Sequence, residues 1–234
     1  MDVTRTGFVA ALLLGAVPAL GQEHAMQVIL KGDLTTSSEL FPHSDASDPV
    51  LRAESLSLTD SFGFGMEGRY RFPESNVAVG VSTDYLRTTT SNPLVANDGE
   101  SIPVEDGYAV TSLEVTGYFI IPASGPTFGI FMGGGAGAYF GHRLYRIAGT
   151  EAATIDRQAG FGIHVLGGVS YKLAEWFSVL AEMKFRDLQF SSTNAFGVSQ
   201  VMYNGSVVPL PTQSMEARVH TDGIIFQLGA AFGL

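Results

Sequence analysis

The sequence has no cysteine and few charged residues. Without cysteine there is no disulfide framework, no thiolate metal site and no cysteine nucleophile. Charged residues make up 15% of the chain, against roughly 25% in an ordinary soluble domain. The 13 basic residues are outnumbered by 23 acidic ones, giving a net charge of −10. Such a chain repels phosphate backbones, so nucleic acid is not an expected partner.

The sequence also lacks an apolar run long enough to cross a membrane as a helix. The longest, residues 8–20, has 13 residues, whereas a transmembrane helix needs about 20. Arg5 precedes this run and small residues end it, which is the layout of a secretory signal cleaved after Gly21. We therefore predict a signal peptide over residues 1–21 and an exported domain over residues 22–234. The alternative is an N-terminal anchor or a buried helix.

What is abundant is glycine, 28 of 234 residues, together with a two-residue alternation of apolar and polar side chains. Between Phe62 and Phe72 the even positions are apolar or glycine, and the odd positions include Glu67, Arg69 and Arg71. A period of two places these sets on opposite faces of a strand. The same alternation recurs in residues 26–31, 77–85, 111–119, 128–140, 161–171, 177–185 and 224–232, which predicts eight strands. Five apolar residues fall on the polar face instead: Ile29, Phe131, Leu166, Leu180 and Ile225.

The connections between these strands alternate in length. Short ones cover residues 73–76, 122–126 and 172–175, and long ones cover about 33–60, 87–107, 146–158 and 191–217. Short turns at one end and long loops at the other are typical of a transmembrane barrel. In the last loop, Tyr203-Asn204-Gly205-Ser206 predicts a hairpin with a type I′ turn.

In this alternation and loop pattern the chain resembles the small eight-stranded outer-membrane barrels, a group that includes the OmpA transmembrane domain and the OmpX-like and opacity-like proteins. The likeness covers nearly all of residues 25–234. It implies an all-β, eight-stranded antiparallel up-and-down transmembrane β-barrel with short periplasmic turns and long extracellular loops. It also implies a Gram-negative outer-membrane location, a monomer, and contacts with outer-membrane lipid and lipopolysaccharide. Assembly machinery in that group reads a C-terminal aromatic residue; here Phe232 is in phase, but the chain ends in Leu234.

Aromatic residues cluster near both ends of the predicted strands, where a membrane barrel carries its interfacial girdles. Those near the short turns are Tyr70, Phe72, Phe119, Phe128, Tyr171, Trp176 and Phe232. Those near the long loops are Phe62, Tyr85, Phe140, Phe161 and Phe185. The middle of the apolar face carries no charge. These features favour the membrane barrel over a soluble periplasmic barrel whose apolar face surrounds a bound lipid.

If the apolar face meets lipid, the polar face points into a lumen so narrow that side chains fill it. Nine charged residues then lie inside and must pair, because an unpaired buried charge is costly: Lys31, Glu67, Arg69, Arg71, Asp84, Glu114, Glu182, Lys184 and Arg186. We predict a salt-bridge network that plugs the lumen. The alternative is a small gated pore, with Gly133, Gly135 and Gly137 freeing space, although these glycines could equally let Arg69, Arg71 or Tyr139 cross the lumen.

Ten further acidic residues are assigned to the first two long loops: Asp33, Glu39, Asp45, Asp48, Glu54, Asp60, Asp98, Glu100, Glu105 and Asp106. No spacing typical of a calcium loop appears among them, so we predict no metal site.

Some small barrels modify lipid A with a histidine and a serine at the outer rim. The rim histidines here, His142 and His220, lack a His-x-Ser pattern, and His164 lies mid-strand as an expected structural residue. No nucleophile elbow, zinc helix or phosphate loop appears. We therefore predict no catalytic residues and no cofactor. The interpretation is a non-enzymatic outer-membrane barrel with a structural or surface-interaction role, and a lipid A-modifying enzyme is the alternative.

Overall fold

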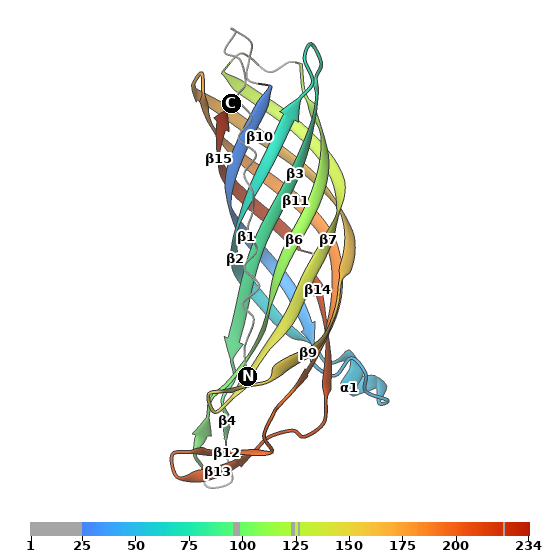
Figure 1. Cartoon of the computed structure of the whole chain (residues 1–234), viewed down its shortest axis with the longest axis vertical. Helices are drawn as coiled ribbons and strands as arrows, with labels where there is room; N and C mark the ends of the chain where they lie inside the picture. Colours follow the sequence, from blue (N-terminus) through green and yellow to red (C-terminus); the bar gives the residue numbers. More distant parts are fainter. Residues whose placement is uncertain (1–24, 96–98, 123–124, 126, 222) are drawn as a thin grey trace, which may run out of the picture.

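The computed structural model describes residues 25–95, 99–122, 125, 127–221 and 223–234 (Figure 1). The predicted signal peptide, residues 1–21, lies outside the described residues, as does part of the turn predicted at 122–126. In the part of the chain that the structure describes, no helix is long and apolar enough to cross a membrane.

Eight long strands form a closed antiparallel ring, drawn obliquely in Figure 1. They are β1 (Met26–Phe41), β2 (Leu56–Arg71), β3 (Val77–Ser91), β6 (Val104–Ile120), β7 (Phe128–Ile147), β10 (Gly160–Ala174), β11 (Phe177–Ala195) and a last strand in two pieces, β14 (Met215–Thr221) and β15 (Ile224–Gly233). Each strand pairs with the next, and the ring closes where β1 pairs with β15, for example Val28 with Phe232. The predicted eight-stranded up-and-down topology is confirmed.

Short elements occupy the end of the barrel away from the tight turns, at the bottom of Figure 1. They are α1 (Pro49–Ala53), β4 (Leu94–Val95), β5 (Ser101–Ile102), β8 (Thr150–Glu151), β9 (Ala153–Gln158), β12 (Gln200–Tyr203) and β13 (Ser206–Pro209). Between β12 and β13, Asn204 and Gly205 have φ of 47° and 89°. Two successive positive φ values define a type I′ turn, so the predicted hairpin is confirmed.

The strands are longer than predicted, and the long loops are correspondingly shorter. The loops expected at 33–60 and 87–107 shrink because β1 continues to Phe41, β2 begins at Leu56 and β3 continues to Ser91. The physical reason lies inside the ring, where Leu40, Leu58 and Leu86 are buried against one another. The strands therefore continue past their predicted ends because they enclose an apolar core there.

The apolar face of the alternation points outward. Phe62, Leu228 and Phe161 have exposed fractions of 71%, 71% and 79%, although a soluble lipid-binding barrel would bury such residues around its ligand. The five exceptions named from the sequence point inward and are buried. The barrel thus presents a continuous apolar belt to its surroundings and keeps its charges inside.

The lumen is filled in layers. Nearest the tight turns lie two small apolar clusters: Ala78, Tyr118, Phe131 and Leu166 in one, and Ile29, Leu180 and Ala231 in the other. A charged layer follows. Beyond it lies the main core of Leu40, Leu58, Leu86, Tyr108, Val110, Tyr139, Leu188, Phe190, Ala217 and Val219. A last cluster, Val104, Ile147, Ala152, Phe196, Val208 and Leu210, is built partly from the loops and from hairpin β12–β13.

Candidate functional site: the charged layer of the lumen

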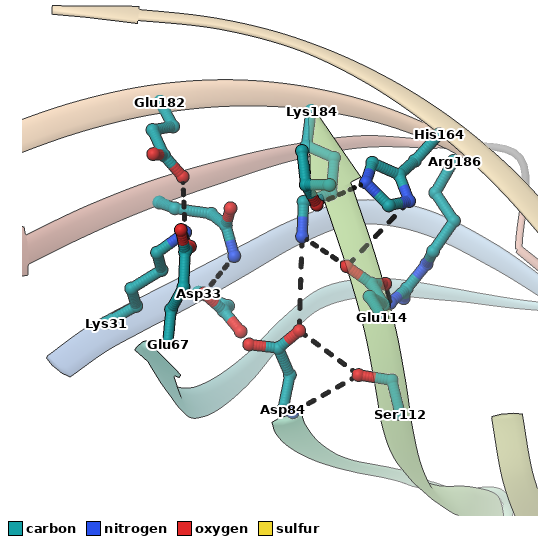
Figure 2. A network of polar contacts seen from close by, with 12 residues as sticks. Lys31, Asp33, Glu67, Asp84, Ser112, Glu114, His164, Glu182, Lys184 and Arg186 are labelled. Carbon is teal, nitrogen blue, oxygen red and sulfur yellow. Dashed lines mark hydrogen bonds and ion pairs between the residues drawn. The ribbon is translucent and has the colours of Figure 1, made fainter. Parts of the chain in front are cut away.

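The charged layer begins with a ring of four alternating charges. Lys31 of β1 lies 2.5 Å from Glu67 of β2 and 2.6 Å from Glu182 of β11 (Figure 2). Arg69 of β2 closes the ring, with Nε 2.7 Å from Glu67 and Nη2 2.8 Å from Glu182. Each cation therefore contacts both carboxylates, and the four formal charges cancel. This ring is called the four-charge ring below.

A second group centres on Glu114 of β6. Lys184 Nζ donates to Glu114 Oε2 at 2.8 Å, and the Tyr139 hydroxyl donates to Oε1 at 2.9 Å. Arg186 and His164 approach the same carboxylate at 3.7 and 3.9 Å (Figure 2). Four side chains from three strands thus converge on one buried carboxylate, and this is the geometry that a dehydrated charge requires.

Shorter polar side chains fill the space between these groups. The Gln227 side-chain amide donates to Asp33 at 2.7 Å, and the Ser112 hydroxyl donates to Asp84 at 3.1 Å. Asp84 also lies 3.9 Å from Lys184, which links it to the Glu114 group (Figure 2). Polar contacts therefore extend across the full width of the barrel.

The structure brings together eight of the nine charged residues predicted for the lumen: Lys31, Glu67, Arg69, Asp84, Glu114, Glu182, Lys184 and Arg186. Arg71 lies apart from them, near the tight turn after β2, where its Nε donates to the Ser75 carbonyl at 3.5 Å. Asp33 was wrongly assigned to a loop: it lies on β1, buried beside Gln227. Continuing the alternation two residues past Lys31 would have placed it in the lumen.

Glycines in the wall make room for the large side chains of this layer. A Cβ at Gly80 would collide with the Glu67 carboxylate and the Tyr118 ring, and one at Gly137 would meet Glu114 and the Tyr139 hydroxyl. The Arg69 guanidinium lies 3.8 Å from the centre of the Tyr118 ring across the lumen. Of the three glycines named from the sequence, Gly137 has the space beside it taken by the Tyr139 side chain, which is one of the crossings that the sequence left open.

Two cavities bound the charged layer. One of about 10 Å³ lies where it meets the main apolar core, lined by Asp84, Leu86 and Lys184 among others. This volume is about the size of one water molecule. The other, about 350 Å³, opens at the tight-turn mouth.

The aromatic residues predicted at the tight-turn end lie on the outer surface or at the turns. Tyr70, Phe72, Phe119, Phe128, Tyr171 and Trp176 are exposed, and Phe232 is half-buried. The Trp176 ring stacks on Phe232, with centroids 6.3 Å apart. At the other end Phe62, Tyr85, Phe140, Phe161 and Phe185 are all exposed.

Just beyond this second set, the outer wall carries a basic row. Arg87 of β3 pairs with Ala109 of β6, which pairs with His142 of β7. Paired residues share a face of the sheet, and Ala109 is buried between its neighbours. Burial lowers the pKa of His142 below its ordinary 6.5, and the nearby charges of Arg157 and Arg87 lower it further.

The two rim histidines have different surroundings in the described part of the chain. His220 Nε2 lies 3.2 Å from Asp187, and no hydrogen bond joins either His142 or His220 to a serine among the described residues. His164 contacts the Thr116 hydroxyl at 2.9 Å inside the lumen. No three His, Asp or Glu side chains of the described ranges gather as metal ligands.

Two acids predicted in a loop belong to strand β6 and are paired. Arg143 binds Asp106 through two hydrogen bonds of 2.8 and 2.5 Å, and Arg146 contacts Glu105 at 3.0 Å. The prediction missed them because the alternation in β6 weakens toward Val104. These pairs lie in the part of the barrel wall that extends beyond the apolar belt, away from the tight turns. This part is drawn toward the bottom of Figure 1 and is called the upper wall below.

Comparison with known proteins supports the fold. No protein-family model and no curated protein matches the chain. The solved structure of outer membrane protein OprG from Pseudomonas aeruginosa is 14% identical, with a TM-score of 0.54 over 91% of this chain and 97% of OprG. Neisserial surface protein A is 14% identical (TM-score 0.45, 90% and 97% covered), and outer membrane protein W of E. coli is 14% identical (TM-score 0.41, 91% and 100% covered). The chain has the fold of the small outer-membrane β-barrels, as the resemblance implied.

Proposed function

We propose that this protein is an integral outer-membrane barrel with a closed lumen and a structural or surface-interaction role, without enzymatic activity. The observation that carries the proposal is the outward apolar belt on a closed ring of strands. A closed ring satisfies every backbone hydrogen bond without an exposed edge, which hydrocarbon requires of a spanning sheet. On this proposal the tight turns face the periplasm and the ordered upper wall faces outside.

The closed lumen is supported by the way its side chains fill it. Counting inward from the tight turns, an apolar layer, a paired charged layer and the main apolar core follow one another. The cavity between the last two holds about one water. A hydrated ion therefore finds no path through the layers as they stand.

Lipopolysaccharide is the proposed lipid partner of the outer wall. Arg87, the permanent cation of the basic row, lies immediately beyond the exposed ring of Tyr85, and His142 lies beyond that of Phe140, where the phosphates of an outer-leaflet glycolipid sit above its acyl chains. Arg87→Gln should weaken retention of diphosphorylated lipid A on the purified barrel and leave retention of a dephosphorylated form unchanged. An equal loss of retention for both forms of lipid A would mean that Arg87 does not contact the phosphates.

Assembly machinery that reads C-terminal strands is the proposed partner during insertion. Phe232 is the aromatic residue in phase at the end of β15, and its ring packs on Trp176 and Phe177. Phe232→Ala should lower the yield of assembled barrel in cells but still allow refolding in detergent. Normal yield in cells would argue that the signal lies elsewhere.

The central experiment is a gel mobility assay on isolated outer membranes, with and without boiling. A closed barrel resists SDS until it is heated, so the unboiled band should migrate differently from the boiled one. Recovery of the protein in the soluble periplasm without such a shift would overturn the membrane assignment. The purified barrel should then give no discrete conductance in planar bilayers. Steady channel openings would mean that the lumen is a pore and is not plugged. Lipid A acylation unchanged by His142→Ala and His220→Ala would agree with a non-enzyme.

A further inference from the structure

The cavity at the tight-turn mouth has the construction of a binding site. Its volume is about 350 Å³, within the range of roughly 300–1,000 Å³ typical of small-molecule pockets. The apolar part of its lining includes Ile121, Phe128 and Trp176, and its inner end meets the rings of Tyr118 and Phe131. Polar residues of the lining include Asn76 from the turn after β2 and Ser178 from β11. This cavity is called the mouth cavity below.

The charge of the mouth cavity is opposite to that of the whole protein. Arg71 and Lys172 line it against a single carboxylate, Glu175; Arg69 also lines it, but its charge is balanced by Glu67 and Glu182. The chain as a whole carries a net charge of −10. A cleft lined by one sign of charge between low-dielectric walls concentrates ions of the other sign. The mouth cavity therefore attracts anions although the protein as a whole repels them.

Arg69 supplies a positioned donor at the inner end. Its side chain is 11% exposed and is held from two sides, because Nε binds Glu67 and Nη2 binds Glu182. The guanidinium plane also lies 3.8 Å from the centre of the Tyr118 ring. These contacts fix the guanidinium and use two of its three nitrogens, Nε and Nη2. A donor that is already immobilised loses little side-chain entropy on binding.

We propose that the mouth cavity binds a small organic anion, a carboxylate or phosphate ester with an apolar body, from the periplasmic side. The anionic group lies against Arg69 with Lys172 nearby, and the apolar body lies against Ile121 and Trp176. The volume limits the ligand to a small metabolite. The periplasmic side rests on the proposed function; the site itself does not.

The test uses Trp176, which is the only tryptophan of the chain and lines the mouth cavity. The barrel in detergent micelles is titrated with cyclohexanecarboxylate and, separately, with the neutral cyclohexanecarboxamide, while Trp176 fluorescence is recorded. We expect a saturable change with the carboxylate and a much weaker one with the amide. Lys172→Gln should weaken carboxylate binding about tenfold, which is the effect of one charge-assisted hydrogen bond.

The matched control is Arg52→Gln, which removes a cation from the exposed helix α1 at the opposite end and should leave the titration unchanged. Equal responses to the acid and the amide, or a carboxylate affinity that Lys172→Gln does not alter, would overturn the site. So would the absence of any saturable change. Because ligand in solution can reach the tight-turn mouth of a barrel in micelles, failure here leaves the membrane assignment standing, and that assignment is decided by the mobility assay alone.

Discussion

Glu182→Gln is the sharpest test of the four-charge ring. The carboxylate of Glu182 contacts Lys31 at 2.6 Å and Arg69 at 2.8 Å, and neither Glu182 nor Lys31 has more than 1% of its side chain exposed. Removing its charge leaves two cations sharing Glu67. Breaking a buried ion pair in this way costs about 3–5 kcal/mol, because the remaining charge is uncompensated. We expect a loss of that size in the free energy of unfolding.

The second variant needed is Lys31→Met with Glu182→Gln. It removes one charge of each sign and leaves Arg69 paired with Glu67, so most of the stability should return. Replacing a buried pair by uncharged groups is often nearly neutral. We therefore expect a strong positive coupling between the two positions in a double-mutant cycle.

The assay is guanidinium unfolding in lipid vesicles, followed by Trp176 fluorescence and by the gel mobility shift. Glu39→Gln, on the exposed face of β1, serves as the control and should change stability by no more than about 0.5 kcal/mol. If Glu182→Gln were as stable as the Glu39→Gln control, the four-charge ring would not be a desolvated network. So would a double variant no more stable than Glu182→Gln.

Three further predictions concern the upper wall. Arg143→Leu leaves Asp106 without its bidentate partner and should cost about 3 kcal/mol, measured as faster proteinase K cleavage above the belt; cleavage at the wild-type rate would contradict it. The lowered pKa of His142 means that the unfolded chain binds the proton more tightly, so stability falls as pH drops through about 6.5. The loss should disappear in His142→Gln, and equal pH profiles in chemical unfolding would count against it. Gly205→Ala places a Cβ at φ 89° and should cost about 1–2 kcal/mol, seen as faster hydrogen exchange in hairpin β12–β13 and in no other strand.

The sequence predicted the strand order and the inward face because both follow from one period. Alternation alone located each predicted strand. Ile29 and Leu180 are apolar residues on the otherwise polar face, and their place in the alternation correctly predicted that they point into the lumen. Their burial shows that the lumen itself has apolar layers. The period could not show this, because it assigns a residue to a face and not to a height along the barrel.

The strand ends and several pairings could not be predicted, for the same reason. Above the belt the outer face becomes polar, so the contrast between the two faces fades while the strand continues. Asp33 and Asp106 therefore looked like loop acids, although each has a partner far away in the sequence, Gln227 and Arg143. Only the register between strands brings such residues together, and that register depends on the closed ring.

The four-charge ring has a consequence for the timing of assembly. Glu67, Lys31 and Arg69 come from the adjacent strands β1 and β2, but Glu182 arrives from β11, 151 residues away from Lys31 in the sequence. While the first and last strands have not yet met, Lys31 and Arg69 share only Glu67, so the β1–β2 edge carries a local net positive charge on a surface about to leave water. Joining β1 to β15 supplies the missing charge and removes the last open edge in a single event. A partly closed barrel therefore has both an unbalanced buried charge and an open strand edge, each of which is unfavourable in lipid. Insertion into the membrane should proceed without a long-lived open intermediate.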